Sequence, residues 1–374
     1  MLKSLVELHG FAYTSILRPL IFQFNSELVH ERFTQLGESI GNVPLANNIL
    51  RNLMRFEDNS LTQTIANITF GNPVGLAAGF DYEAKLTQVL PTIGFGFGTI
   101  GTITNRAYKG NPPPLLGRLP KSKSLLVNKG FKNSGVKVII QKLKRYHFDI
   151  PIGISIGRTN TTKFKTLKQA IDDIKQAYKV VEKSKLPFSY YELNISCPNL
   201  YGKIDFYPPK NLDKLLTEID KLILSRPVFI KMPINNPNEN IKDMLNIINK
   251  HNITGVIFGN LQKDRSDPSL DPTEVAKYER GYFSGKPTEK RSNELISLTY
   301  KLSGKKLVII GCGGVFSAED AYKKIRLGAT LVQLITGLIY QGPQLPTQVN
   351  YGLIKLLKKD GFKHISEAIG IDSR

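Results

Sequence analysis

Residues 65 to 374 contain a regular series of short apolar segments separated by amphipathic segments of helical length. Continuous apolar strands that alternate with helices are typical of a parallel sheet covered on both faces. Eight such units over about 300 residues predict a closed (β/α)₈ barrel of the TIM type. An open doubly wound sheet is the alternative, but no G-x-G-x-x-G motif follows the first strand. The predicted strands are 74–77, 96–102, 152–156, 191–195, 228–232, 255–258, 307–310 and 331–334.

Residues 1–56 form a separate helical extension in this interpretation, and residues 57–374 form the barrel domain. Apolar side chains recur there at steps of three and four residues, which predicts amphipathic helices. We expect Pro19 to kink or end the first helix, and Asn25 or Ser26 to cap the second. A helical segment this apolar must pack on the main domain or lie in a membrane interface, and the pattern alone leaves both open.

The composition limits the kinds of partner. The formal net charge is +20, but there is no zinc-finger spacing, no aromatic RNA-binding motif and no long basic run. We therefore predict a solvated basic surface and no nucleic-acid partner, with attraction to an anionic membrane surface as a further possibility. Two cysteines, Cys197 and Cys312, do not make a disulfide framework and fit a reducing compartment. We predict neither a membrane-spanning segment nor a signal peptide nor a bound metal.

Glycine turns follow the last two predicted strands, at the end of a barrel where catalytic residues gather. GCGG (311–314) follows the seventh strand and ITG (335–337) follows the eighth. Glycine is also needed for ordinary left-handed turns. At these two strands, however, it lets main-chain N–H groups approach a phosphate, helped by the start of a helix. The two turns together favour a phosphate site.

Polar side chains leave the other buried strands. Asn194, Cys197 and Asn199 lie in ELNISCPN after the fourth strand, Lys231 ends the fifth, and Asn260 follows the sixth. A lone cysteine near a strand is more often an inert core residue, but a loop position above the barrel suits proton transfer. A buried lysine is rare unless it is paired, so a functional role is favoured. Small residues in AAGF (77–80) admit a flat ring. These features predict a flavin mononucleotide (FMN) site.

The sequence resembles the dihydroorotate dehydrogenases over nearly its whole length. The resemblance is carried by motifs that are modest singly and specific in this order: GNPVGLAAGFD (71–81), GFGFGTIGTIT (94–104), ELNISCPN, FIKM, SGKP (284–287), VIIGCGGV (308–315), GATLVQLITGLIYQGP (328–343) and KKDGF…EAIG (358–370). It implies oxidation of dihydroorotate to orotate, in which a base removes the C5 proton and a hydride passes to FMN. Cys197 would be the base, and Lys231 would stabilise the negative charge of reduced flavin.

The stretch LRPLIFQFNSELVHERF (17–33) resembles the membrane-associated, quinone-using branch of that family. In that branch two N-terminal helices form a hydrophobic funnel to the flavin, which implies a membrane quinone as electron acceptor. His30 and Arg118 stand where the branch places quinone-site residues. The resemblance also implies peripheral association with the cytoplasmic face of a bacterial-type inner membrane.

The remaining site residues are carried over by position. The implied flavin contacts are Ala77, Ala78, Gly79, Thr102, Asn194, Lys231, Ser284, Gly285, Gly313, Gly314, Thr336 and Gly337. The implied substrate contacts are Asn128, Phe131, Asn133, Asn194, Asn199 and Asn260.

Several positions depart from the family pattern. Cys197 stands where the quinone-using branch has serine, and Tyr82 replaces a lysine that follows the first strand, for which Lys85 is a possible substitute. In the substrate loop, Val127 and Lys132 replace two asparagines, while Asn128 and Asn133 lie one residue away. The other departures are Leu261, Ser155 and Ile335, in place of a threonine, an asparagine and a tyrosine.

These departures keep two other hypotheses open. A paralogue on the same fold would act on another dihydropyrimidine or enone, as the altered substrate loop suggests. A non-catalytic protein that binds a membrane surface is the third reading, but the presence of Cys197, Lys231 and the glycine turns argues against it.

Overall fold

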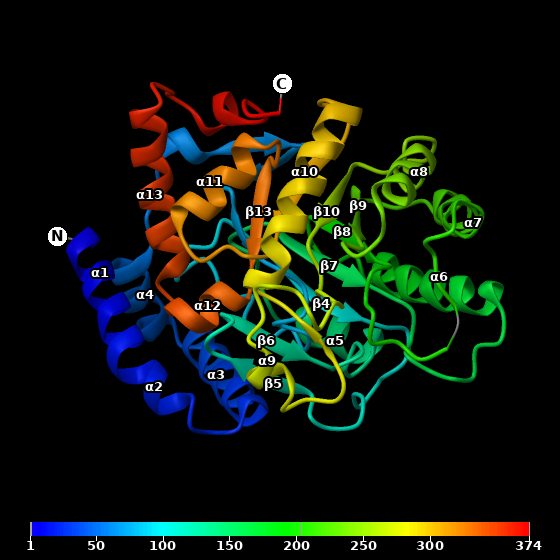
Figure 1. The fold of residues 1–374 in the computed structure, drawn as a ribbon, viewed down its shortest axis with the longest axis horizontal. Helices are drawn as coiled ribbons and strands as arrows, with labels where there is room; N and C mark the ends of the chain where they lie inside the picture. The colour runs from blue at the N-terminus through cyan, green and yellow to red at the C-terminus, as the bar shows by residue number, and fades with distance from the viewer. Residues whose placement is uncertain (1, 203, 374) are drawn as a thin grey trace.

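The computed structural model describes residues 2–202 and 204–373, and its centre is a closed barrel of eight parallel strands (Figure 1). Each strand pairs with its neighbours in chain order, and the last pairs with the first. All eight predicted strands are confirmed within about two residues at each end. The barrel strands are β3 (Val74–Leu76), β4 (Phe97–Ile103), β7 (Ile152–Ile156), β8 (Tyr190–Asn194), β9 (Val228–Met232), β10 (Gly255–Phe258), β12 (Val308–Cys312) and β13 (Leu331–Leu334).

Helices surround the barrel, and each presents an apolar face to it. The connection from β3 to β4 is built from turns instead of a long helix. The outer helices are α5 (Val136–Leu143), α6 (Leu167–Ser184), α7 (Pro209–Asp220), α8 (Asn238–Ile248), α10 (Glu289–Ser303), α11 (Ala318–Arg326), α12 (Thr336–Gln341) and α13 (Leu345–Lys359).

Aromatic rings fill the inside of the barrel. Phe97, Tyr190 and Phe229 are buried there and meet edge to face. Gly75 lies against the ring of Phe97 and Gly153 against that of Tyr190, at positions where a Cβ atom would overlap the ring. The interior is therefore a packed core, as in other barrels of this type, and a ligand must bind at an end of the barrel.

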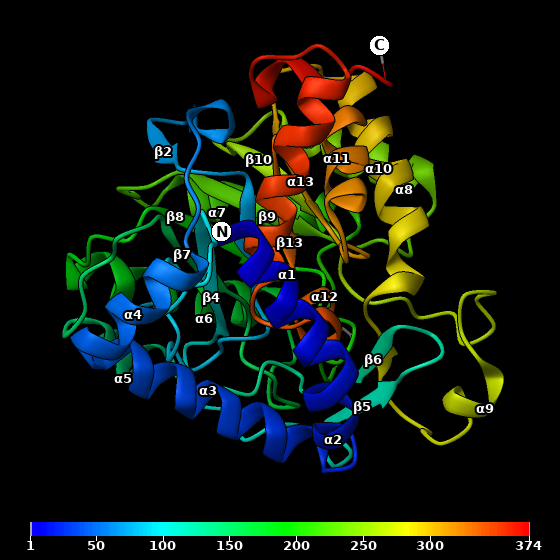
Figure 2. The same cartoon turned by 90° about the vertical axis from the view of Figure 1, so that its left-hand side faces the viewer.

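Four helical segments form the N-terminal extension, which packs beside α13 and the β5 strand (Figure 2). The helical run continues through Pro19 to Ile21, with a wider π-helical turn over Tyr13–Leu17 just before the proline. The side chain of Asn25 accepts hydrogen bonds from two main-chain N–H groups, which confirms the predicted cap. The segments are α1 (Leu2–Ala12), α2 (Arg18–Ile21), α3 (Ser26–Asn42) and α4 (Pro44–Met54).

Two small antiparallel sheets complete the fold. The hairpin of β1 (Gln63–Ile65) and β2 (Ile68–Phe70) brings Phe70 onto Phe97 in the barrel core. The second sheet joins β5 (Leu116–Leu119), β6 (Ser124–Val127) and β11 (Tyr282–Phe283), with the short α9 (Pro272–Val275) beside it. This second sheet lies between the barrel and α3 and forms a wall of the site described below.

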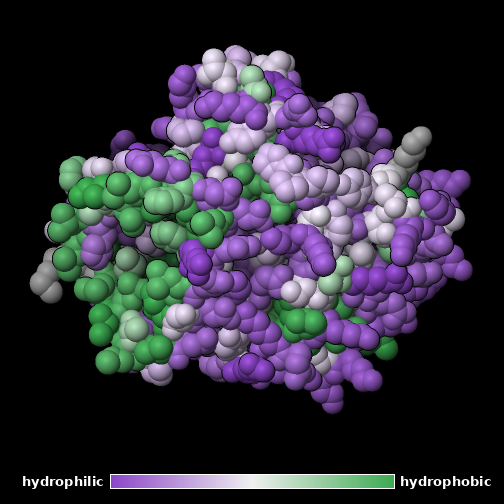
Figure 3. Space-filling view, turned by 90° about the horizontal axis from the view of Figure 1, so that it is seen from below, coloured by the Kyte–Doolittle hydropathy of each residue, from purple (hydrophilic) through white to green (hydrophobic). Residues whose placement is uncertain are grey.

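Large apolar side chains gather on the surface of the extension (Figure 3). Phe11, Ile16 and Leu20 are each more than half exposed. No helix of the described part of the chain is both long and apolar enough to span a bilayer. The other exposed apolar side chains of the extension are Leu8, Leu17, Phe24, Leu28, Phe33, Leu36, Val43, Leu45 and Ile49.

Candidate functional site

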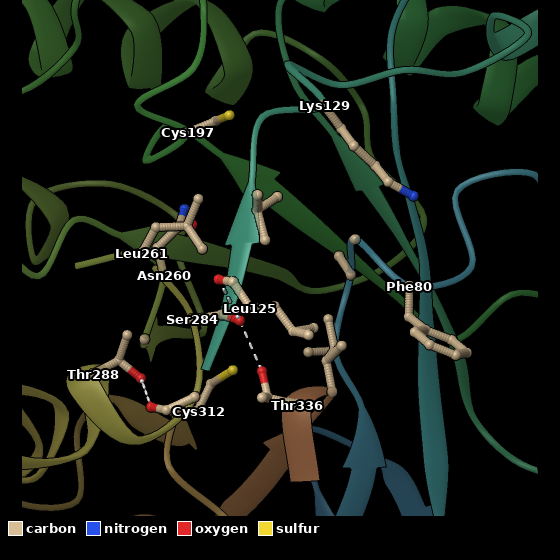
Figure 4. A pocket seen from close by; sticks show the side chains of 18 of the residues that line it. Phe80, Leu125, Lys129, Cys197, Asn260, Leu261, Ser284, Thr288, Cys312 and Thr336 are labelled. Carbon is tan, nitrogen blue, oxygen red and sulfur yellow. Dashed lines mark hydrogen bonds between the residues drawn. The ribbon is translucent and has the colours of Figure 1, made fainter. Parts of the chain in front are cut away.

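A partly open cavity lies over the carboxyl ends of the barrel strands and encloses about 1140 Å³, counting its mouth (Figure 4). The cavity brings together most of the predicted cofactor and substrate residues, although they come from all parts of the chain. Those that line it are Ala77, Ala78, Gly79, Thr102, Phe131, Asn194, Cys197, Asn199, Lys231, Asn260, Ser284, Gly285, Gly313, Gly314, Thr336 and Gly337.

Glycine turns shape one end of the cavity. Gly313 and Gly314 have positive φ angles of +101° and +73°, and a Cβ atom at either would collide with Thr288 or Glu289. Ser284 and Thr336 join the β11 and β13 ends through a 2.8 Å hydrogen bond between their hydroxyls. The two glycines leave their main-chain N–H groups open to a ligand, next to two hydroxyl groups. This arrangement fits the phosphate of a nucleotide cofactor.

A buried polar network supports the floor of the cavity. The amide of Asn194 donates to the Thr102 hydroxyl at 2.7 Å, and Thr102 lies 2.9 Å from the Ser155 hydroxyl. Ser155 donates to the carboxylate of Glu192 at 2.8 Å, so its oxygen accepts from Thr102. The ammonium of Lys231 lies 3.9 Å from Glu192. The network thus fixes the orientation of the Asn194 amide and balances the charge of the buried lysine.

Glu192 was not predicted as a site residue. Its side chain is fully buried, and one carboxylate oxygen has no hydrogen-bond partner among the described residues. The signal was an acidic residue inside the apolar fourth strand, two positions before the predicted contact residue Asn194. A buried carboxylate needs a counter-charge, which strand pairing supplies by setting Asn194 of β8 beside Lys231 of β9.

Cys197 lies in the loop after β8, with its thiol in the cavity. Burial raises the pKa of this thiol to about 11, while the main-chain N–H of Asn199 and the charge of Arg158 act to lower it. Most of the thiol therefore stays protonated at neutral pH.

Two further predicted amides line the same region. The amide of Asn199 donates to the main-chain oxygen of Val127 at 3.0 Å, which ties the Cys197 loop to β6. The amide of Asn260 donates to Ser196 at 2.6 Å, and Ser196 in turn donates to the Asn194 oxygen. The three asparagines are therefore pre-oriented at the cavity wall.

Asn128 and Asn133, predicted to contact substrate, do not line this cavity. The amide of Asn128 bonds to Asn111 and to the main-chain oxygen of Pro112. The amide of Asn133 bonds to Thr104 and to nearby main-chain groups. Both side chains are buried and hold the loop in shape. A displacement of one residue from the family pattern turned them away from the site.

Lys85 does not line the cavity either, so it does not replace the lysine missing at Tyr82. Lys129 lines it instead, with its ammonium 4.2 Å from the centre of the Tyr82 ring. Lys132 also lines the cavity, but its ammonium is engaged in ion pairs with Glu27 at 2.8 Å and Glu31 at 3.5 Å on α3. The cationic side chain beside Tyr82 therefore comes from the loop after β6 and not from the first strand.

A second, strongly apolar cavity lies beneath the N-terminal extension. It encloses about 1310 Å³ and shares His30, Phe80, Leu116, Leu125 and Ile339 with the first cavity. His30 and Arg118, the predicted quinone residues, both line it. Phe33 and Leu36 also line it although they are partly exposed, so the cavity lies directly beneath the apolar surface of Figure 3.

His30 stands at the junction of the two cavities. Its Nε2 atom lies 2.9 Å from the Phe80 carbonyl oxygen, which can only accept, so Nε2 carries the proton. Burial, with the nearby charge of Lys129, lowers the pKa of His30 to about 3. The imidazole is therefore neutral at physiological pH, and its Nδ1 atom has no partner among the described residues. Arg118 donates to the main-chain oxygen of Phe24 at 2.7 Å and packs over the Phe22 ring.

The rim of the barrel combines the turn at Gly313 and Gly314, here called the glycine cradle, with a paired buried lysine and a thiol. This is the architecture of an enzyme that acts on a small molecule. The family model of dihydroorotate dehydrogenase matches residues 60–357. Dihydroorotate dehydrogenase (quinone) of Nautilia profundicola is 35% identical over 363 residues, covering 96% of this chain and 97% of the relative. That of Trichodesmium erythraeum is 33% identical over 380 residues, covering 97% and 99%.

The fold agrees with this relationship. The crystal structure of DHODH from Eimeria tenella in complex with ferulenol has a TM-score of 0.83 and 27% sequence identity, and covers 96% of this chain and 99% of its own. The chain belongs to the dihydroorotate dehydrogenase family, whose members are flavin-dependent oxidoreductases.

The glycine cradle can be tested by filling it. We expect Gly313→Val to lower the flavin content of the purified protein at least tenfold, because a branched side chain at φ +101° closes the turn onto Thr288. Gly361→Val is the matched control, since Gly361 has a positive φ of +78° with nothing near its Cβ position. Visible absorbance after gel filtration measures bound flavin. Equal flavin content in the two variants would contradict the cradle.

Proposed function

We propose that the protein oxidises dihydroorotate to orotate with FMN as cofactor and a membrane quinone as electron acceptor. The observation that carries the proposal is the junction of two cavities. One carries polar groups, among them a thiol, three lysines and three asparagines, and the other is apolar and lies under exposed apolar helices. A reaction that takes electrons from a polar molecule and passes them to a lipid-soluble one needs both.

The residues present fit FMN. The turn at Gly313 and Gly314, with Ser284 and Thr336, would hold the phosphate, and the small residues Ala77–Gly79 would leave room for the ring. Lys231 would lie by the ring edge that becomes negative on reduction, with its own charge balanced by Glu192. When bound, FMN supplies the acceptor for the hydride of the substrate.

Cys197 is our proposed general base. Its thiolate would take the C5 proton of dihydroorotate, while Asn194, Asn199 and Asn260 orient the ring through their amides. Arg158 is 4% exposed and favours the thiolate by its charge. Burial of the thiol at the same time disfavours its charged form.

The pH dependence of the first half-reaction tests the base. Only the thiolate accepts a proton, and the thiol pKa is raised to about 11, so the thiolate fraction grows about tenfold for each pH unit below that value. We expect the rate of flavin reduction by dihydroorotate to rise steadily between about pH 7 and 9.5. Cys197→Ala should keep flavin and lose at least 100-fold in rate. A plateau near pH 8, or an unchanged rate in Cys197→Ala, would remove Cys197 from this role.

The apolar cavity is our proposed quinone channel. It leads from the cluster of exposed apolar side chains on α1, α2 and α3 to His30 and Phe80, which also line the polar cavity. Burying such a surface in lipid stabilises the bound state by roughly 25 cal/mol per Å² of apolar area. The net charge of +20 adds attraction to anionic lipids. We therefore propose peripheral binding to the cytoplasmic face of a membrane.

Membrane binding can be tested without touching the site. We expect the triple variant Phe11→Ser, Ile16→Ser and Leu20→Ser to bind anionic vesicles at least tenfold more weakly, with slower turnover of a long-chain quinone embedded in them. Reduction of a soluble dye acceptor should be unchanged. The matched control replaces three exposed apolar residues outside the extension by serine: Val138, Ile223 and Leu302.

Co-sedimentation with vesicles measures the binding. Equal sedimentation of the triple variant and its control would contradict the proposed membrane surface.

The substrate loop favours one alternative, a paralogue that acts on another dihydropyrimidine, because Tyr82 and Val127 replace expected polar residues and Leu261 lines the cavity. Steady-state turnover separates the two. We expect rapid orotate formation from dihydroorotate with a soluble quinone, and little oxidation of the uncharged dihydrouracil. Turnover of dihydrouracil but not of dihydroorotate would favour the paralogue.

A further inference from the structure

Lys129 differs from two other buried lysines, Lys231 and Lys324, because its ammonium has neither a hydrogen-bond partner nor an ion pair among the described residues. Its side chain is 8% exposed, and its ammonium nitrogen makes no hydrogen bond to any described residue. By contrast, Lys231 lies beside Glu192, and Lys324 bonds to Ser292 and Asn293. Leaving a buried charge unpaired is costly. A site that keeps such a group is incomplete without an anion.

The surroundings of Lys129 leave it available for a ligand. The nearest carboxylates, Glu27 and Glu31, are engaged by Lys132. The ring of Tyr82 lies under the ammonium at 4.2 Å, and His30 stacks on the same ring at 5.5 Å between ring centres. A cation held by a ring face keeps its N–H groups free to donate. Lys129 lines the cavity, and Figure 4 shows its ammonium end on the side of the cavity where Phe80 lies.

We propose that Lys129, positioned by the ring of Tyr82, is the cationic anchor that binds the carboxylate of the substrate. The proposal rests on the proposed function, because dihydroorotate carries a carboxylate that dihydrouracil lacks. It assigns the anchor to the loop after β6, from which no cationic ligand was expected. Tyr82 stands at the position of the missing lysine. Its ring then supports the ammonium of Lys129, which comes from the loop after β6.

The charge state of Lys129 provides a second readout. Burial lowers the pKa of Lys129 to about 7, with Lys132 acting in the same direction and Glu27 and Glu31 opposing it. The neutral His30 and the phenol of Tyr82 complete the groups that face it. Because Lys129 carries its charge only below its pKa, binding of an anion should be stronger at low pH.

The test compares orotate with its uncharged methyl ester, each titrated into the flavin-loaded protein and followed by the visible absorbance of the flavin. We expect Lys129→Met to weaken orotate binding about 10- to 100-fold, the range for loss of a charged hydrogen bond, and to change ester binding little. Lys129→Arg should recover part of the loss. Lys85→Met is the control, because it removes a nearby positive charge outside the cavity and should bind both compounds as the unaltered protein does.

A preference for orotate over the ester that survives in Lys129→Met would overturn the anchor. The unaltered protein gives an independent test if that variant loses its flavin. Its preference for orotate should fall from pH 6 to pH 9, and a preference that does not change with pH also overturns the proposal. Failure of the unaltered protein to bind orotate or to be reduced by dihydroorotate would instead refute the proposed function.

Discussion

Closure of the barrel decides where chemistry can occur in this protein. Each of the eight strands finds its main-chain partners in two neighbours, so the strands end together at one rim. The interior below that rim is filled by Phe97, Tyr190 and Phe229, with Gly75 and Gly153 giving the rings their space. A ligand therefore lies on top of the core, and the strand ends and the loops after them supply its contacts.

The two lysines at this rim illustrate two ways of keeping a buried charge. Lys231 has a permanent partner in Glu192, and a chain of hydroxyls links that pair to Asn194. Its charge is thus available to a cofactor without depending on it. Lys129 has only an aromatic ring beneath it. We infer that Lys231 supports the bound cofactor, whereas Lys129 binds an anionic substrate when one enters the cavity.

The extension links the rim of the barrel to the exposed apolar surface of the N-terminal helices. α3 bears His30, whose neutral ring contacts both Phe80 and Tyr82, so one residue borders the polar and apolar cavities. The same helix holds Lys132 through Glu27 and Glu31. One helix therefore contacts both the substrate loop and the proposed quinone channel.

The barrel was predictable because its signal is local: apolar runs, helical periodicity and turn residues. The glycine turns, Cys197 and Lys231 followed from their places at strand ends. Glu192 was missed because its meaning depends on the register between β8 and β9. Lys129 was not singled out, and Asn128 and Asn133 were expected in the cavity that they do not line, because no periodicity fixes which side chains of a loop face inward.

Anaerobic titration of the flavin-loaded protein tests the central claim most directly. Addition of dihydroorotate should bleach the visible absorbance of the flavin with formation of one orotate per flavin, and a soluble quinone added next should restore the absorbance. Flavin that stays oxidised in dihydroorotate, although a chemical reductant bleaches it and the quinone then restores it, would contradict the account.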